Sequence, residues 1–340
     1  MTSRIDIGLA RYSDWAFTSS VVVLVGALLL LAVELAYSRG RKVDERSREE
    51  EMAGASVRVG ATVGAESATP GVVLEEPKRP FDERIGQSGL ALVYVGIGLL
   101  LVCIVLRGLA TSRVPWGNMY EFINLTCFSG LVAGAVVLHK AQYRTLWVFV
   151  LVPVLILLTV SGRWLYTNAA PVMPALQSYW LPIHVSVVSL GSGVFLVAGV
   201  ASILFLLKMS PLAEARTRGG QEDQVNGLRR IVERLPDGRT LDRIAYRTTI
   251  FAFPVFGFGV IFGAIWAEEA WGRYWGWDPK ETVSFIAWVV YAAYLHARST
   301  AGWRDRKAAW INVIGFVAMV FNLFFINLVT AGLHSYAGVG

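Results

Sequence analysis

Eight long stretches of the chain carry almost no charge, and this feature limits the fold more than any other. A helix that crosses a bilayer needs about 20 mostly apolar residues, because lipid cannot satisfy exposed backbone polar groups. The stretches lie near residues 17–37, 88–110, 121–138, 145–161, 184–207, 249–267, 283–298 and 308–330. Only 16% of the residues are charged, against about 25% in average soluble domains. The sequence therefore predicts an all-α polytopic membrane protein with about eight transmembrane helices.

The positive charges divide unevenly between the two sides of these predicted helices. The loops on one side hold 24 of the 31 Lys and Arg residues. Because positively charged loops stay inside, this side is predicted to be cytoplasmic. The N-terminus, the C-terminus and the loops at 111–120, 162–183 and 268–282 then face the extracytoplasmic side. This topology accounts for the net charge of +6, so we expect no nucleic-acid partner.

The polar segments divide the chain into an anchor, a linker and a core. Residues 1–37 are predicted to form an N-terminal membrane anchor. Residues 38–85 are rich in Arg, Glu, Gly, Ala and Ser, cannot bury enough apolar surface to fold, and are expected to form a disordered cytoplasmic linker. Residues 86–340 are predicted to form a seven-helix core. In a second polar segment, residues 228–235 have the apolar spacing of a short amphipathic helix at the inner leaflet.

A tryptophan-rich segment, residues 266–282, joins two of the predicted helices on the external side. Trp271 and Trp275 are four residues apart, a spacing that puts two side chains on one helix face. Trp277 follows Gly276, whose missing side chain leaves room for a flat partner. The alternative is an interfacial aromatic belt. The density of aromatic side chains favours a platform for a planar apolar ligand.

The four residues Asp278, Pro279, Lys280 and Glu281 have the pattern of a helix start. Asp is a strong N-cap, Pro suits the first helical position, and Glu three residues after the cap completes a capping box. We therefore expect the seventh transmembrane helix to begin here. A ligand role for one of the carboxylates is the alternative.

Four histidines lie near the ends of predicted helices. His184 and His334 fall on the external side, where two imidazoles near an aromatic bed suit a flat metallocycle better than a bare ion. His139 is typical of a headgroup contact. His296 lies about 27 Å along the helix from Asp278, close to the inner boundary of the bilayer. It is either a functional group at membrane depth or a residue emerging into the cytoplasm.

Five short motifs together resemble one known family. They are PWGNMYE at 115–121, PIH at 182–184, WGRYWGWDPKE at 271–281, YLH at 294–296 and GLHSY at 332–336. The third resembles the WWD signature of haem-handling proteins. Its Asp-Pro-Lys-Glu ending resembles the CcsA/ResC branch of cytochrome c maturation system II, called CcsB in some lineages. The first 84 residues lie outside the pattern, and Val283 stands where the family often has another Trp.

The resemblance implies roles for particular residues. His184 and His334 are expected to be the axial ligands of haem iron, and His296 the ligand of a transmembrane haem site. The other residues expected to bind haem are Trp271, Trp275, Trp277, Asp278, Trp116 and Glu121. The ligand is expected to be haem b, carried as a substrate to be attached.

The resemblance also implies a function. It is haem delivery across the plasma membrane by a multi-pass protein, and presentation of haem at its extracytoplasmic face to an apocytochrome c with a C-x-x-C-H motif. The chain is then one part of a holocytochrome c synthase of the haem lyase type, together with a ResB-type subunit. Thiol-reducing pathway proteins and membrane lipid are further expected contacts. Two alternatives stay open: a haem transporter or carrier without ligation activity, and a structural assembly subunit.

Overall fold

The computed structural model describes residues 5–58, 81–172, 176–210, 227–326 and 329–330. Its elements in chain order are α1 (Ile7–Arg58), α2 (Phe81–Thr111), α3 (Met119–Val137), the 3₁₀ helix η1 (Ala141–Leu146), α4 (Trp147–Trp164), α5 (Trp180–Lys208), α7 (Gly227–Arg234), α8 (Gly238–Trp271), α9 (Pro279–Ser299), α10 (Arg306–Phe321) and the π-helix η4 (Asn322–Ile326). All of these elements are helices, as predicted for an all-α membrane protein.

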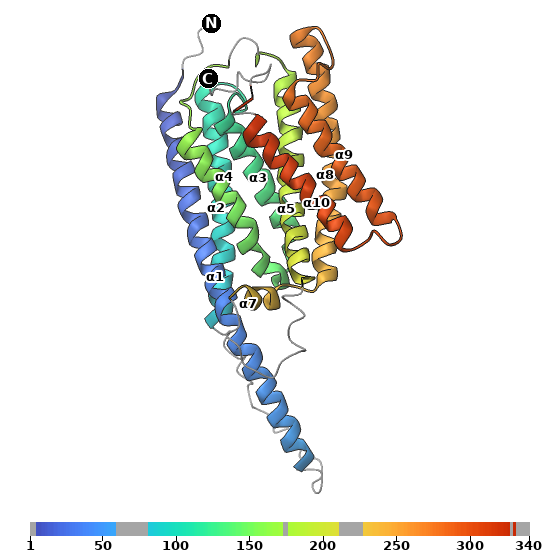
Figure 1. Ribbon diagram of the computed structural model, residues 1–340. Helices are drawn as coiled ribbons and strands as arrows, with labels where there is room; N and C mark the ends of the chain where they lie inside the picture. The colour runs from blue at the N-terminus through green and yellow to red at the C-terminus, as the bar shows by residue number, and fades with distance from the viewer. Residues whose placement is uncertain (1–4, 59–80, 173–175, 211–226, 327–328, 331–340) are drawn as a thin grey trace, which may run out of the picture.

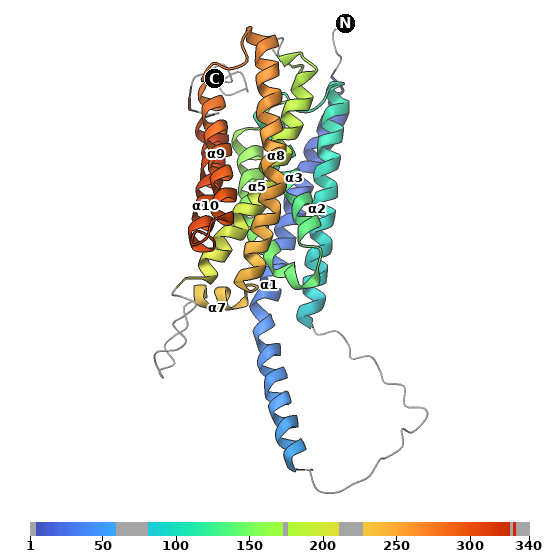
Figure 2. The ribbon, with the colours of Figure 1, turned by 90° about the vertical axis from the view of Figure 1, so that its right-hand side faces the viewer.

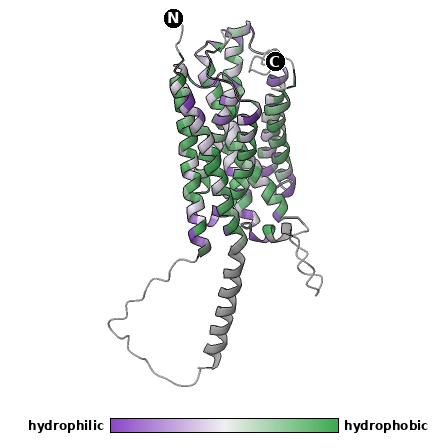
Figure 3. Cartoon of the chain, turned by 90° about the vertical axis from the view of Figure 1, so that its left-hand side faces the viewer, coloured by the Kyte–Doolittle hydropathy of each residue, from purple (hydrophilic) through white to green (hydrophobic). Residues whose placement is uncertain are grey.

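Seven segments of the described chain are long and apolar enough to cross a membrane. They are Ile7–Ala36, Glu83–Thr111, Met119–Val137, Ala141–Trp164, Trp180–Lys208, Gly238–Trp271 and Arg306–Ile326. The one remaining predicted span, the seventh in chain order, is α9, a helix of 21 residues that packs against α8 and α10. It is the most polar of the eight because Lys280, Glu281, His296 and Arg298 lie along it. Figure 3 shows hydrophobic residues along most of the helix lengths and several hydrophilic stretches towards both ends of the bundle.

The helices run alternately up and down, so each end of the bundle collects a fixed set of connections (Figures 1 and 2). The upper end in Figure 1 holds the start of α1 and the α2–α3, α4–α5 and α8–α9 connections. The lower end holds η1, α7 and the α9–α10 connection. All loops predicted to face outwards therefore meet at one end. We call this end the WWD end, after the α8–α9 connection.

Helix α1 is part of the same hydrophobic core as the rest of the bundle. Its residues Leu24 and Leu31 are fully buried, together with Leu100 of α2. At the lower end of the bundle, Glu34 of α1 accepts a hydrogen bond of 2.8 Å from Arg144. Helix α1 therefore packs against the predicted core. Within the predicted linker, α1 continues to Arg58 and α2 begins at Phe81; residues 59–80 lie outside the described part of the chain.

The predicted amphipathic helix is present as α7 and is tied to two neighbours. Lys208, at the end of α5, donates from Nζ to the carbonyl of Val232 at 2.8 Å. Arg234 donates to the carbonyls of Leu35 and Ala36 on α1. Val232 and Leu235 are buried in the bundle. The apolar face of α7 therefore packs against protein at the lower end.

Close helix crossings bring α5 to the centre of the bundle. The backbones of Gly130 on α3 and Gly193 on α5 touch, since a Cβ at either would meet the other backbone. Small residues allow helices in lipid to approach in this way. Phe195 of α5 stacks on Tyr291 of α9 with 3.6 Å between ring centroids. Helix α5 thus has α3, α8, α9 and α10 around it, and these helices together with α4 form the walls of the site.

Candidate functional site

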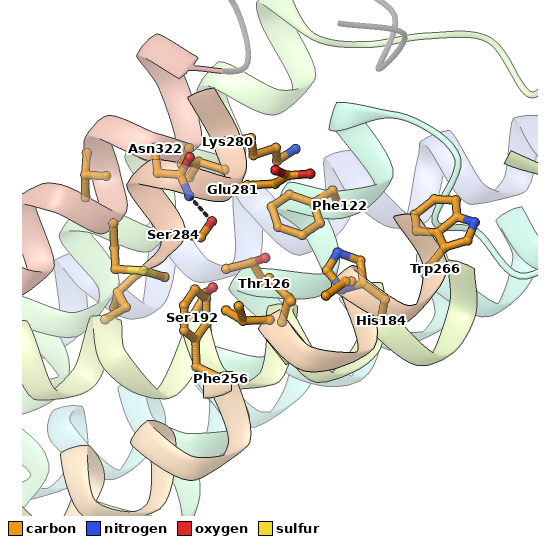
Figure 4. A pocket seen from close by; sticks show the side chains of 18 of the residues that line it. Phe122, Thr126, His184, Ser192, Phe256, Trp266, Lys280, Glu281, Ser284 and Asn322 are labelled. Carbon is orange, nitrogen blue, oxygen red and sulfur yellow. Dashed lines mark hydrogen bonds between the residues drawn. The ribbon is translucent and has the colours of Figure 1, made fainter. Parts of the chain in front are cut away.

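A cavity of about 120 Å³ lies inside the bundle towards the WWD end. Its walls come from α3, α4, α5, α8, α9 and α10, together with the α8–α9 connection. Most of the lining is aliphatic or aromatic. Figure 4 shows the polar side chains that face it, which are Thr126, His184, Ser192, Lys280, Glu281, Ser284 and Asn322.

His184 lies in the first turns of α5 and is held by α8. Its Nδ1 is 2.8 Å from the carbonyl oxygen of Gly259, so Nδ1 carries the proton and donates it. Its ring lies 5.9 Å from the Trp266 ring, centroid to centroid. Gly263 leaves room for the imidazole against α8, because a Cβ at this glycine would lie 2.7 Å from His184 Cε1. The hydrogen bond selects the tautomer with the lone pair on Nε2, the atom that can bind a metal.

The tryptophan segment is a turn rather than a continuing helix. Helix α8 ends at Trp271, because Gly272 adopts a left-handed conformation (φ 70°) and its N–H bonds to the Glu268 carbonyl at 2.8 Å. This is the usual way in which a glycine terminates a helix. The prediction that Trp271 and Trp275 share one helix face is therefore wrong. Both nevertheless line the cavity, because the chain folds back after Gly272.

The space beside Gly276 is occupied by another side chain of this protein and is not left for a flat ligand. A Cβ at this position would overlap the guanidinium of Arg273. The space expected to admit a planar partner is thus filled by that cation. The next residue, Trp277, has a positive φ of 57° and is 69% exposed.

The capping box predicted for α9 is present. The Asp278 side chain accepts from the backbone N–H of Lys280 at 3.2 Å. Oε2 of Glu281 accepts from the N–H groups of Gly276 and Asp278 at 2.9 and 3.1 Å. Both carboxylates therefore hold the turn, and Asp278 is buried without lining the cavity.

A second space of about 580 Å³ opens on the outside of the bundle between α8 and α9. Its lining, as far as the described residues show it, carries no charged residue and includes Trp275, Trp277, Phe285 and Trp288. Trp288 stacks on Phe253 with 4.9 Å between ring centroids and an interplanar angle of 5°. We call this space the α8–α9 groove. It shares three lining residues with the cavity, namely Val260, Ala264 and Trp275, so Trp275 stands between the two.

Trp116 and Glu121 lie at the same end of the bundle but do not line the cavity. Trp116 packs in the cluster around Trp266 and donates to the Ser186 hydroxyl at 2.9 Å. Glu121 is buried and pairs with two arginines: its carboxylate lies 3.2 Å from Arg107 Nε and 2.9 Å from Arg113 Nη1. In this structure Glu121 holds the α2–α3 connection to the bundle.

The α4–α5 connection packs beside this region. Leu176 and Val172 belong to the cluster around Trp266, and the Ser178 hydroxyl lies 3.0 Å from Glu269 at the end of α8. Tyr166 donates its phenolic proton to Asp14 at 2.8 Å. Burial raises the pKa of Tyr166, and the hydrogen bond to Asp14 adds to the rise. The segment is therefore anchored to α1, α3 and α8 by particular contacts.

Two of the other three histidines lie at the opposite end of the bundle. His139 and His296 lie near the lower end, and the His296 side chain is exposed on α9. His334 is outside the described residues. The structure thus brings His184, Trp271 and Trp275 to one cavity, with Trp116, Trp277 and Asp278 nearby, and keeps His296 apart as the sequence predicted.

Six polar residues of the cavity were not among the predicted haem-binding residues, namely Thr126, Ser192, Lys280, Glu281, Ser284 and Asn322. Lys280 and Ser284 lie on the first turns of α9, and Asn322 begins η4. The Asn322 amide donates to the Ser284 hydroxyl at 2.8 Å (Figure 4). The sequence signal that could have revealed Asn322 is its amide side chain within an uncharged predicted span, since polar groups at membrane depth are usually functional. A π-helix at the same point is another common mark of a functional site.

A family model and two relatives show the family to which the chain belongs. Residues 116–334 match the family model described as cytochrome C assembly protein. CcsA, a cytochrome c biogenesis protein of Guillardia theta, is 34% identical over 260 residues, with 72% of this chain and 85% of the relative covered. CcsA of Gloeobacter violaceus is 33% identical over 292 residues, with 74% and 85% covered. The chain belongs to the CcsA family of cytochrome c assembly proteins.

A solved structure shares the fold at much lower sequence identity. The cytochrome c haem lyase CcmF superposes with a TM-score of 0.58 at 16% identity, over 93% of this chain. The chain spans 46% of the length of that protein. The likeness covers α1 as well as the later helices, although the family model begins only at residue 116.

Proposed function

We propose that this chain delivers haem across the plasma membrane and presents it to apocytochrome c, as one subunit of a system II synthase. Its family is one of cytochrome c biogenesis, and such biogenesis requires haem handling. The observation that carries the proposal is the His184 imidazole, oriented by Gly259 towards a cavity walled by Trp266, Trp271 and Trp275.

His184 is oriented in the way that metal-binding histidines usually are. A histidine that binds a metal usually donates its other ring N–H to a backbone carbonyl, which fixes the tautomer and makes the ligand more basic. The 2.8 Å contact with Gly259 has this form. His334 is the second axial ligand in the proposal, on the family resemblance. Two neutral imidazoles hold haem iron firmly and tune its potential.

The cavity that His184 lines is too small for a porphyrin by itself, but it adjoins the larger groove. Pockets for drug-sized ligands have about 300–1,000 Å³. The cavity has about 120 Å³ and the α8–α9 groove about 580 Å³. We propose that the macrocycle occupies both, with the Trp275 side chain turning aside to admit it. The stacked Phe253–Trp288 pair then forms a flat wall for the apolar part of the ring.

In the attachment reaction, the main role of this chain is to position haem. Each haem vinyl group takes up a cysteine thiol of the C-x-x-C-H motif: the S–H bond adds across the C=C bond and leaves a thioether, with no net oxidation. The nucleophile comes from the apocytochrome. Holding the vinyl groups near the thiols supplies the rate, since orientation alone lowers a barrier substantially.

His296 is the proposed ligand where haem is taken up on the cytoplasmic side. Its side chain is exposed on α9, at the end of the bundle opposite to His184. A histidine directed out of the bundle fits a site completed by a second protein. The ResB-type subunit is the proposed source of the second imidazole and of the surface that receives apocytochrome c.

The test is the visible spectrum of the complex purified with its partner subunit. Wild type is expected to show a six-coordinate low-spin haem spectrum, and His184→Gly and His334→Gly are each expected to lose it and regain it with added imidazole. His139→Gly is the matched control and is expected to leave the spectrum unchanged. Unchanged spectra in both external variants would refute axial ligation.

Covalent cytochrome c in the co-expressing cells separates a synthase from a carrier. Membrane-bound haem without any holocytochrome would indicate transport alone. A complex that lacks haem absorbance, with normal cytochrome levels in His184→Gly, would indicate a structural subunit.

A further inference from the structure

We propose that haem reaches the His184 cavity from the lipid side, along the outer face of α9 and through the α8–α9 groove past Trp275. This inference rests on the proposed function and deepens it, because it names the route by which the substrate enters the same site. The groove adjoins the cavity through shared lining residues, and Trp275 is the largest of them.

The interior of the bundle is filled below the cavity. Phe195, Phe256 and Tyr291 come from α5, α8 and α9, and none is more than 1% exposed. The rings of Phe195 and Tyr291 stack with 3.6 Å between their centroids. Helix α10 packs directly on Tyr291, since a Cβ at Gly315 would lie 3.0 Å from its ring. Packing of this density leaves no passage for a porphyrin between these side chains, so haem from the cytoplasmic side needs another path.

An exposed stripe of α9 joins the groove to His296. Phe285, Val289 and His296 have the spacing that puts side chains on one helix face, and all three are exposed. Phe285 lines the groove, and no charged residue stands between it and His296 in the chain. The stripe is roughly 16 Å long at the rise of an α-helix, and α9 lies at the edge of the bundle (Figure 1). The proposed uptake histidine and the groove therefore share one apolar outer face.

Trp275 is held in a way that lets it move. Its ring makes edge contacts with Trp277 and Phe285, at centroid distances of 5.9 and 6.1 Å and interplanar angles of 90° and 75°. No hydrogen bond from the described residues holds its indole N–H. A rotamer change of this one side chain opens the groove to the cavity, and the smaller Val260 and Ala264 then form the sides of the opening.

Lateral entry suits an apolar macrocycle. The ring stays in hydrocarbon between the two sites, so its apolar surface is never exposed to water on the way. The tightly packed contacts among α5, α8, α9 and α10 remain intact, and only Trp275 has to move. The outward direction of the His296 side chain has the same explanation, since haem taken up there is already on the outer face of α9.

The experiment places single cysteines on the alternative routes in the full complex and determines which of them retains haem. A thiol beside haem adds its S–H bond across a vinyl C=C bond and leaves a thioether, with no net oxidation. The haem then stays on the polypeptide in a denaturing gel. Val289→Cys on the stripe and Phe285→Cys in the groove are both expected to gain covalently retained haem.

Two variants and the wild type are the controls. Val317→Cys replaces an apolar side chain that is 60% exposed on α10 and lines neither the cavity nor the groove. Ala252→Cys places a thiol in the filled interior, where Ala252 is fully buried beside Phe256. Both are expected to retain no more haem than wild type, whose two cysteines are buried. In a Val289→Cys background, His296→Gly is expected to abolish the retained haem, because uptake precedes passage along the stripe.

Retained haem on Ala252→Cys would show an interior route and overturn the inference. Equal retention on Val289→Cys and Val317→Cys would show haem dissolved in the bilayer at large and would also overturn it, as would retention on neither Val289→Cys nor Phe285→Cys. If Ala252→Cys fails to assemble, the comparison of Val289→Cys with Val317→Cys still decides. A normal His184-dependent low-spin spectrum beside any of these results leaves the proposed function standing, whereas absence of haem from wild type would remove both.

Discussion

The substitution Gly263→Ala tests how His184 is held. The added Cβ would lie 2.7 Å from His184 Cε1 and 2.9 Å from Nδ1, whereas ordinary contacts begin at 3.4 Å. The imidazole must retreat by about 0.7 Å, the difference between 3.4 and 2.7 Å. Gly259 and Gly263 are four residues apart on α8 and so share one face. A ring pushed off Gly263 is therefore also pushed off the Gly259 carbonyl, and their 2.8 Å hydrogen bond lengthens to the limit of such bonds.

The free-energy change follows from three contributions. Overpacking costs about 1–3 kcal/mol, and the lost hydrogen bond costs about 1 kcal/mol. Alanine in place of glycine in a helix returns about 1 kcal/mol. We expect the free energy of unfolding to fall by about 1–3 kcal/mol, and the low-spin haem spectrum of the purified complex to weaken.

The matched control for this prediction is Gly98→Ala. A Cβ at Gly98 meets nothing within 4 Å, so this variant is expected to be as stable as wild type or slightly more stable, with an unchanged spectrum. Thermal unfolding in detergent and the visible spectrum are measured on both variants. If Gly263→Ala matches Gly98→Ala in both measurements, the contact between α8 and His184 does not hold the imidazole as described.

Three further substitutions probe other parts of the structure. Glu121→Gln removes the negative charge that Arg107 and Arg113 share, while Asp14 stays 3.6 Å from Arg107. We expect a loss of about 1–3 kcal/mol in thermal unfolding; the exposed Glu268→Gln is the control and should change little. Asp278→Ala removes the N-cap of α9 and is expected to cost about 0.5–2 kcal/mol, seen as faster hydrogen exchange in the first turn of α9; unchanged exchange would contradict the capping role. His296→Ala removes an exposed side chain, so thermal unfolding should not change, while haem content per complex is expected to fall if His296 takes up haem; an unchanged content would argue against that role.

The sequence predicts the membrane-spanning helices well because hydropathy is a local property. A run of apolar residues must form a helix in lipid, whatever its neighbours are. The helix ends are less well predicted. Helix α8 begins at Gly238, where Asp237 caps it by accepting from the Thr240 N–H at 3.1 Å, although the apolar run begins only near residue 249. Polar turns extend a helix beyond the bilayer without changing its hydropathy signal.

Local rules also predict the start of α9 correctly and the end of α8 incorrectly. The capping box at Asp278 uses only groups within four residues, so composition reveals it. The stop at Gly272 depends on one positive φ, and a glycine inside an aromatic run is also tolerated within a helix. The spacing of Trp271 and Trp275 therefore suggested a shared helix face that the turn prevents.

The amino-acid sequence alone determined that this is a helical membrane protein, that its aromatic connection and His184 belong to one end, and that its motifs resemble the CcsA family. The tertiary structure decided which of these residues meet. His184 faces the cavity because Gly259 and Gly263 of α8 admit and hold its ring, Glu121 is occupied by Arg107 and Arg113, and Lys280 shares the lining with the imidazole. These contacts join helices that are distant in the chain. They follow from the packing of the whole bundle, which no short segment of the sequence determines.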